Sequence, residues 1–259
     1  MTTLTLQEHF NQTAPTFVQA NFIYDEIAQR LIEHLLPIKI KPARILDLGC
    51  GTGTMLPLLK KLYKTTDIAG VDLAQERLNL IANKRWFGKK IFKLIQADAC
   101  RLPFADQSLD LVIANLVAHW LPLDEWLAEM HRVLKPNGVL IFSYYGPDTL
   151  RQVSVPKKAF TDMHDMGDLL VKYRFADPAL DQEQITIEYD NARDAWLDLE
   201  ANGENILLEE KNFDVSADKD FFVTYEIVYA HAWRAPDSLG QAADADGVVR
   251  IPVSKIGRR

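Results

Sequence analysis

The apolar positions of the first 42 residues have the spacing of one helix face. They recur at every fourth residue, at Ile23, Ile27, Leu31 and Leu35, and charged residues lie between them. This period places the apolar side chains on one side of a helix and the charged ones on the other. Prolines at positions 37 and 42 mark the end of the pattern. The sequence therefore predicts an N-terminal helical segment over residues 1–42.

From residue 43 the pattern changes to short apolar runs that alternate with helical stretches. The expected strands are residues 44–48, 67–73, 92–97, 109–115 and 139–144. The expected helices between them are residues 54–62, 75–84 and 123–134. Strands and helices in alternation are typical of a parallel sheet that is covered by helices on both faces. Residues 43–146 are therefore predicted to form a Rossmann-like, doubly wound α/β core.

The alternation stops after residue 146. Residues 165–173 and 192–199 have helical spacing, whereas residues 185–189 and 221–233 are expected to be strands. Residues 235–247 are mostly small or acidic and are expected to form a loop. We interpret residues 147–234 as a substrate-side insertion with the last strands of the sheet, and residues 235–259 as a tail.

Composition narrows the class of partner. The 259 residues carry a net charge of -7, so a broad basic surface for nucleic acid is not expected. The two cysteines and six histidines show no ligand spacing, and we expect no metal site. No apolar run approaches the roughly 18 residues of a membrane span. The N-terminus lacks a secretory signal pattern, and a cytoplasmic protein is expected.

A glycine-rich loop follows the first expected strand. Gly49, Gly51 and Gly53 stand at alternate positions, with Cys50 inside the loop, and the next helix presents its free N–H groups to the same place. Asp47 precedes the first glycine by two residues. Its carboxylate would repel a pyrophosphate but would accept a hydrogen bond from an ammonium group, which favours S-adenosylmethionine (SAM) over a dinucleotide. The alternative is a tight turn that binds no ligand.

Further candidate residues follow the next three strands, at Asp72, Leu73, Asp98, Ala99, Asn115 and Leu116. The carboxyl ends of parallel strands form the edge where open α/β sheets bind ligands. An acid at Asp72 suits the ribose hydroxyls, or it caps the next helix. Asp98 suits the adenine amino group, or it caps a loop. Asn115 and Leu116 are placed to close over the methionine end.

These motifs resemble those of the class I SAM-dependent methyltransferases. The similar segments are residues 46–53, 70–73, 98–104, 104–110 and 129–138. The resemblance implies a mostly parallel, seven-stranded sheet, with N-terminal helices and an insertion after strand five. It implies SAM as the cofactor and S-adenosylhomocysteine as its product.

Other segments are similar to the malonyl-[acyl-carrier protein] O-methyltransferases of biotin synthesis, the BioC group. They are residues 10–14, 145–150, 162–168, 175–178 and 228–233. This similarity implies methylation of the free carboxylate of a malonyl group on an acyl carrier protein. Assembly factors of respiratory complex I share the late motifs, so a protein-directed assembly or modification factor stays an alternative. A methyltransferase for another small acid or a quinone is a third reading.

A malonyl carboxylate is already ionised at neutral pH and needs no general base. Its second oxygen would be held by a cation, for which the resemblance to the BioC group makes Arg151 the candidate; the alternative is a solvated surface charge. Phe17 and Tyr24 are expected to face the substrate if the N-terminal helix forms a lid; the alternative is a helix that only packs on the core. His119 either packs a loop or serves as a base for a hydroxyl acceptor.

Overall fold

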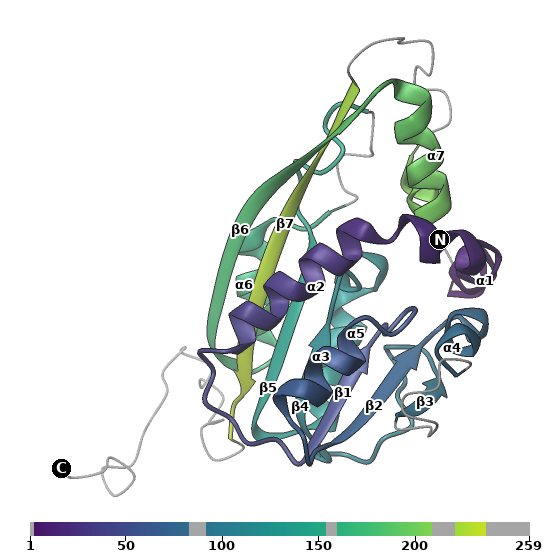
Figure 1. Cartoon of the computed structure of the whole chain (residues 1–259). Coiled ribbons are helices and arrows are strands. Elements are labelled where there is room, and N and C mark those ends of the chain that lie inside the picture. The colour runs from purple at the N-terminus through teal and green to yellow at the C-terminus, as the bar shows by residue number, and fades with distance from the viewer. Residues whose placement is uncertain (1–2, 83–91, 154–159, 209–220, 237–259) are drawn as a thin grey trace, which may run out of the picture.

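The structure is a computed structural model, and it describes residues 3–82, 92–153, 160–208 and 221–236. Its centre is a seven-stranded sheet in the order β3-β2-β1-β4-β5-β7-β6 (Figure 1). The parallel strands are β1 (Arg44–Leu48), β2 (Asp67–Asp72), β3 (Lys93–Gln96), β4 (Leu109–Ala114) and β5 (Leu134–Tyr145). Strand β7 (Phe221–Arg234) runs antiparallel to β5 and to β6 (Phe175–Tyr189). The predicted mostly parallel, seven-stranded α/β fold is confirmed.

Helices cover both faces of the sheet. They are α1 (Thr3–Ala20), α2 (Phe22–Leu35), α3 (Met55–Leu62), α4 (Gln75–Ala82), α5 (Leu123–Val133), α6 (Met163–Lys172) and α7 (Ala192–Asn202), with short 3₁₀ turns η1 (Ala118–Trp120) and η2 (Glu204–Leu207). Successive side chains of a strand point to opposite faces. Ile45 accordingly joins the apolar cluster beneath α2 and α3, whereas Leu46 joins the cluster beneath α5 and α6. Burial on both faces explains why the central strands are continuous apolar runs.

The N-terminal segment consists of two helices, in agreement with the N-terminal helices that the resemblance implies. Helix α2 buries the apolar face that the sequence predicts, from Ile23 to Leu35, and it crosses the sheet beside β5. Helix α1 packs against α4 and α7 (Figure 1). The helical pattern ends at Leu35, and residues 36–43 form a turn and an irregular link to β1.

Strand β6 begins ten residues earlier than residues 185–189 predict. It starts at Phe175 and pairs with β7 along its length. Its exposed positions are mostly Asp, Gln and Glu, which conceal the strand in the sequence pattern. Pro178 lies where the register shifts between Ala176 and Ala179, a position in which a strand tolerates proline. The end of the helix expected over residues 75–84, and nearly all of the tail, lie outside the described residues.

Candidate active site

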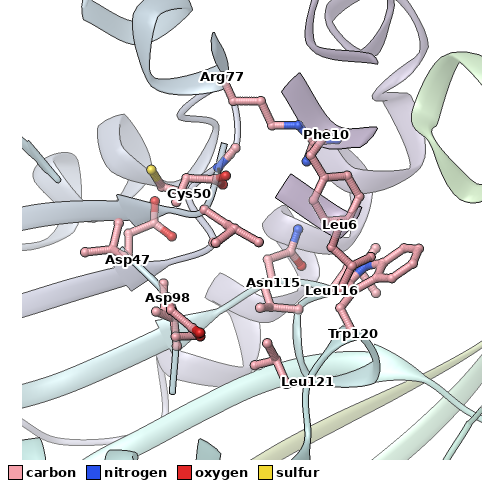
Figure 2. Close-up of a pocket in the computed structure, with 18 of the residues that line it drawn as sticks. Leu6, Phe10, Asp47, Cys50, Arg77, Asp98, Asn115, Leu116, Trp120 and Leu121 are labelled. Carbon is pink, nitrogen blue, oxygen red and sulfur yellow. Dashed lines mark hydrogen bonds between the residues drawn. The ribbon is translucent and has the colours of Figure 1, made fainter. Parts of the chain in front are cut away.

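One pocket opens at the carboxyl ends of β1, β2, β3 and β4, and Figure 2 shows side chains that line it. The residues that line it from these strand ends include Asp47, Gly49, Cys50, Gly51, Asp72, Leu73, Asp98, Ala99, Asn115 and Leu116. Ten of the eleven residues expected to hold the cofactor therefore border one cavity; Gly53 does not. Leu6, Phe10 and Phe17 of α1, and Tyr24 of α2, close it from the N-terminal side.

The glycines of the loop after β1 are required for different physical reasons. All three have positive φ, with values of +66°, +52° and +86° at Gly49, Gly51 and Gly53. A Cβ on Gly49 would lie 2.3 Å from Cγ2 of Val117, so packing alone forbids a side chain there. Gly51 faces the open cavity, because the nearest atom to its Cβ would be 3.9 Å away, on Phe17. Gly51 is thus the glycine at which a ligand can approach the backbone closely.

The Asp72 carboxylate ties this loop to the end of β2. Its Oδ2 accepts a hydrogen bond from the Gly51 backbone N–H at 2.8 Å, and Oδ1 accepts one from the Ala74 N–H at 2.8 Å. The second bond closes a short turn before α4, because its donor Ala74 precedes the first residue of the helix, and it is not a helix-capping bond. A carboxylate oxygen has two lone pairs, so Asp72 retains acceptor capacity for a ribose hydroxyl. Its role toward ribose remains a prediction.

Asp47 is a buried carboxyl whose Oδ2 has no hydrogen-bond partner in the described part of the chain. Its side chain is 1% exposed, and no described residue donates a hydrogen bond to Oδ2. Burial, and then the neighbouring Asp72, raise the pKa of Asp47 to about 8. A buried polar atom without a partner is costly, so the site favours a ligand that brings a donor or a positive charge to Asp47. The ammonium group of a methionine moiety fits this requirement.

Residues that follow β3 and β4 complete the wall of the pocket. Asp98 Oδ1 accepts from the Cys100 N–H at 2.9 Å, which is the loop cap offered as its alternative role. Asn115 is held from both ends of its amide: Oδ1 accepts from Ser143 Oγ at 2.9 Å, and Nδ2 donates to the Tyr24 carbonyl at 3.0 Å. The Asn115 bond therefore connects the end of β4 to helix α2.

The structure brings together two of the three residues expected on the substrate side. Phe17 and Tyr24 both line the pocket and meet edge to face, with ring centroids 4.9 Å apart. Arg151 does not line it, and its side chain is exposed. The structure thus gives Arg151 no contact with the pocket, and its role toward a carboxylate stays a prediction.

His119 is poorly suited to act as a base. Its ring stacks on Tyr145 with centroids 4.4 Å apart, and its Nδ1 accepts from the Tyr145 N–H at 3.4 Å. Desolvation lowers the pKa of His119 to about 3, so the imidazole is neutral and weakly basic near pH 7. These contacts favour the packing role over the catalytic one.

Several residues at the site are not among the predicted ones. Trp120 lines the pocket and meets Phe10 edge-on, with centroids 5.2 Å apart. Arg77 lines it from α4 and is 8% exposed. A signal for Arg77 does exist, because it shares the buried face of α4 with Leu78 and Ile81, where an apolar residue is expected.

Glu204 lies behind Tyr24 and is fully buried. It accepts hydrogen bonds from the hydroxyls of Tyr24, at 2.8 Å, of Tyr225, at 3.0 Å, and of Tyr145. Burial and then Glu204 raise the pKa of Tyr24, so its hydroxyl stays protonated and is committed as a donor. A lone acid in the segment after α7 gives no sequence signal for this cluster.

The site as a whole suits a cationic nucleoside-like ligand. Carboxyl groups lie at the ends of β1, β2 and β3, and aromatic rings cover the N-terminal side. Within the described residues, no group of three or more His, Cys, Asp or Glu could hold a metal ion. Among these residues no helix is long and apolar enough to cross a membrane.

Comparison with known proteins shows which family this chain belongs to. A family profile described as "Methyltransferase domain" matches residues 46–142. A malonyl-[acyl-carrier protein] O-methyltransferase of Legionella pneumophila is 33% identical, over 98% of both chains. The fold is similar to that of the YcgJ protein of Bacillus subtilis, with a TM-score of 0.60 and 16% identity over 80% of this chain and 99% of that one. It is also similar to that of a Haemonchus contortus phosphoethanolamine N-methyltransferase in complex with S-adenosyl-L-methionine, with a TM-score of 0.56 and 16% identity over 81% of this chain and 52% of that one. The chain belongs to the malonyl-[acyl-carrier protein] O-methyltransferase family of class I methyltransferases.

Proposed function

We propose that this protein uses SAM to methylate the free carboxylate of a malonyl group carried by an acyl carrier protein. The observation that carries the proposal is the likeness to the Legionella pneumophila protein over 98% of both chains. That likeness extends beyond residues 46–142, and so includes the elements on the substrate side of the pocket. In this proposal the product is S-adenosylhomocysteine, and the methyl ester enters biotin precursor synthesis.

In this proposal, the acidic residue at each of three strand ends binds a different part of SAM. Asp47 accepts from the ammonium of the methionine moiety, Asp72 from the ribose hydroxyls, and Asp98 from the adenine amino group. When bound, SAM supplies an electrophilic methyl group on its sulfonium. The unpartnered Oδ2 of Asp47 and the open face of Gly51 support this assignment, because each leaves room or bonding capacity for such a ligand.

The chain's own contribution to the chemistry is placement and exclusion of water. A carboxylate acceptor is ionised near pH 7, so no side chain has to remove a proton. The neutral His119 and the protonated Tyr24 agree with a site that lacks a general base. Phe17, Tyr24 and Trp120 provide rings that desolvate the acceptor and align it with the methyl group. Arg151 is the candidate cation for the second carboxylate oxygen, and this role requires it to approach the pocket.

The proposal is tested by incubating the protein with SAM and malonyl-acyl carrier protein, and detecting the methyl ester by mass spectrometry. Acetyl-acyl carrier protein is the matched control, because it keeps the carrier and the thioester but lacks the free carboxylate. We expect methylation of the first substrate only. SAM binding without ester formation on the malonyl substrate would refute the proposal, and would turn attention to protein acceptors or to other small acids and quinones.

Two parts of the proposal concern the cell. Growth of a biotin-requiring bacterium that lacks its own malonyl-acyl carrier protein methyltransferase should be restored by this chain. The protein should be found in the cytoplasmic fraction, and it should not require nucleic acid for activity. If the ester forms in vitro but growth is not restored, the proposed reaction would stand and the proposed role in biotin synthesis would be refuted.

A further inference from the structure

Tyr24 is held at both of its ends in the wall of the pocket. Its backbone carbonyl accepts a hydrogen bond from Asn115 Nδ2 at 3.0 Å, and its hydroxyl donates to Glu204 Oε1 at 2.8 Å. Its ring also meets that of Phe17 edge to face, with centroids 4.9 Å apart. These contacts restrain the main chain, the ring and the hydroxyl separately, so they hold the ring in one position.

The end of α7, which precedes Glu204, is fixed on helix α1 (Figure 1). The last carbonyl groups of a helix lack partners within that helix. Here Thr16 Oγ1 donates to the Ala201 carbonyl at 3.1 Å. His9 Nε2 donates to the Gly203 carbonyl at 2.8 Å. Gly203 has a φ of +82°, which glycine adopts without strain and which ends the helix. This turn brings the Glu204 side chain to α2.

Glu204 is a costly way to fasten these elements together. It is fully buried, and its hydrogen-bond partners in the described part of the chain are the hydroxyls of Tyr24, Tyr145 and Tyr225. Burial raises the pKa of Glu204, because a carboxylate loses its hydration there. Apolar side chains of similar size would join the same elements without that cost. The cluster is therefore better explained by the precise ring positions that its hydrogen bonds specify.

We propose that Glu204 is a positioning residue for methyl transfer, which fixes the hydroxyl of Tyr24 and so holds that ring where the acceptor is aligned with the methyl group. This inference rests on the proposed function. Glu204 does not line the pocket, so it acts through Tyr24. A misplacement of about 1 Å can lower turnover about 100-fold. The strand ends that are expected to bind SAM stay in place, so loss of Glu204 should affect turnover much more than SAM affinity.

The competing explanation is that the cluster only fastens α7 and the segment after it to the sheet. Two matched hydroxyls separate the explanations, because Tyr24 and Tyr225 each donate one hydrogen bond to Glu204, at 2.8 and 3.0 Å. Removal of either hydroxyl takes one bond from the cluster, but of these two residues only Tyr24 lines the pocket. A fastening role predicts the same result for both variants, whereas a positioning role predicts different results.

The experiment compares Tyr24→Phe with Tyr225→Phe in the full chain. It measures kcat with malonyl-acyl carrier protein at saturating SAM, SAM affinity by calorimetry, and the temperature of unfolding. We expect both variants to unfold at a similarly lowered temperature, because each loses one hydrogen bond. We expect kcat to fall by about 10- to 100-fold in Tyr24→Phe and to stay within about twofold in Tyr225→Phe. SAM affinity should change by less than about threefold in either variant.

Two substitutions test Glu204 itself. Glu204→Gln keeps an oxygen that can accept from Tyr24, so kcat should stay within about threefold of that of the unchanged protein. Glu204→Met offers no such acceptor, so its kcat should fall as far as in Tyr24→Phe. In a protein that already carries Tyr24→Phe, Glu204→Met should lower kcat by no more than about a further twofold, because the bond to the hydroxyl is already absent.

Each outcome decides the inference. Equal kcat values in Tyr24→Phe and Tyr225→Phe would overturn it in favour of the fastening role, and this comparison decides alone if Glu204→Met does not fold. Effects of Glu204→Met and Tyr24→Phe that multiply in the double variant would overturn it too, because Glu204 would then act by another route. Absence of methyl ester with the unchanged protein would overturn the proposed activity and this inference together, whereas the other outcomes leave the activity intact.

Discussion

Replacing Asp47 by Asn should weaken cofactor binding and stabilise the ligand-free protein at the same time. Burial and Asp72 raise the pKa of Asp47 from its ordinary value of 3.8 to about 8. Between these two values the folded protein binds more protons than the unfolded chain. The free energy of unfolding therefore falls as pH rises from about 4 to 8, with a slope of up to about 1.4 kcal/mol per pH unit from this group. Asp47→Asn removes that slope, so the variant should be the more stable protein at pH 8.

Cofactor binding should change in the opposite direction. A hydrogen bond to a charged group contributes about 1.5–3 kcal/mol, so loss of the Asp47 carboxylate should weaken SAM binding by about 10- to 150-fold. Binding also moves a proton: with a pKa of about 8, roughly 0.9 of the Asp47 carboxyls are protonated at pH 7 and must ionise to pair with an ammonium. The amino group of SAM takes up a small fraction of a proton when it binds, because part of it is neutral at pH 7. The net release on binding should therefore lie between about half a proton and one proton per protein.

The assay is calorimetry at pH 7 in buffers that differ in ionisation enthalpy, together with urea unfolding at several pH values. Asp67→Asn is the matched control, because Asp67 is exposed at the start of β2. The reasoning is refuted if Asp47→Asn binds SAM as tightly as the unchanged protein, or if it releases the same number of protons on binding.

Three other perturbations follow from the contacts at the site. Asp72→Ala should weaken SAM binding by about 10- to 100-fold in a calorimetric titration and lower the thermal unfolding temperature, because the Gly51 N–H loses its acceptor; unchanged affinity would contradict the ribose assignment. Glu204→Gln should lower the free energy of unfolding in urea by about 1–3 kcal/mol, since the amide oxygen can replace Oε1 as the acceptor for Tyr24 and Tyr145, but the amide nitrogen then faces the Tyr225 hydroxyl, which needs an acceptor; full stability would show that the Tyr225 hydroxyl finds another partner. Gly49→Ala should unfold at lower temperature than the unchanged protein, because its Cβ would lie 2.3 Å from Val117; an unchanged unfolding temperature would show that the loop can move aside.

The sequence predicts best those features that depend on the pattern of apolar residues along the chain. The central strands are buried on both faces, so their apolar runs reveal both their existence and their ends. The residues expected at those ends, such as Asp47 and Asp98, accordingly line one pocket. The sequence does not reveal the start of β6, because its solvent-facing side chains are mostly acids and amides, and an exposed strand gives no apolar run.

Tertiary contacts explain what the sequence could not supply. Glu204 depends on three tyrosines from α2, β5 and β7, which meet only in the folded chain. Arg77 could have been noticed as a charge on the apolar face of α4, but its aromatic partners, Phe10 and Phe17, lie on α1, more than 50 residues away in the sequence. Arg151 is a candidate by resemblance alone, and the structure leaves its side chain exposed and outside the pocket lining.

The most direct test of the proposed activity follows the methyl group itself. SAM labelled with carbon-13 in its methyl group is incubated with the protein and malonyl-acyl carrier protein, and the product is examined by heteronuclear NMR. We predict that the label appears as a methyl ester, coupled across one oxygen to the terminal carboxyl carbon of the malonyl group. Label on the central carbon of the malonyl group or on a protein side chain, or no transfer although SAM binds, would contradict the account.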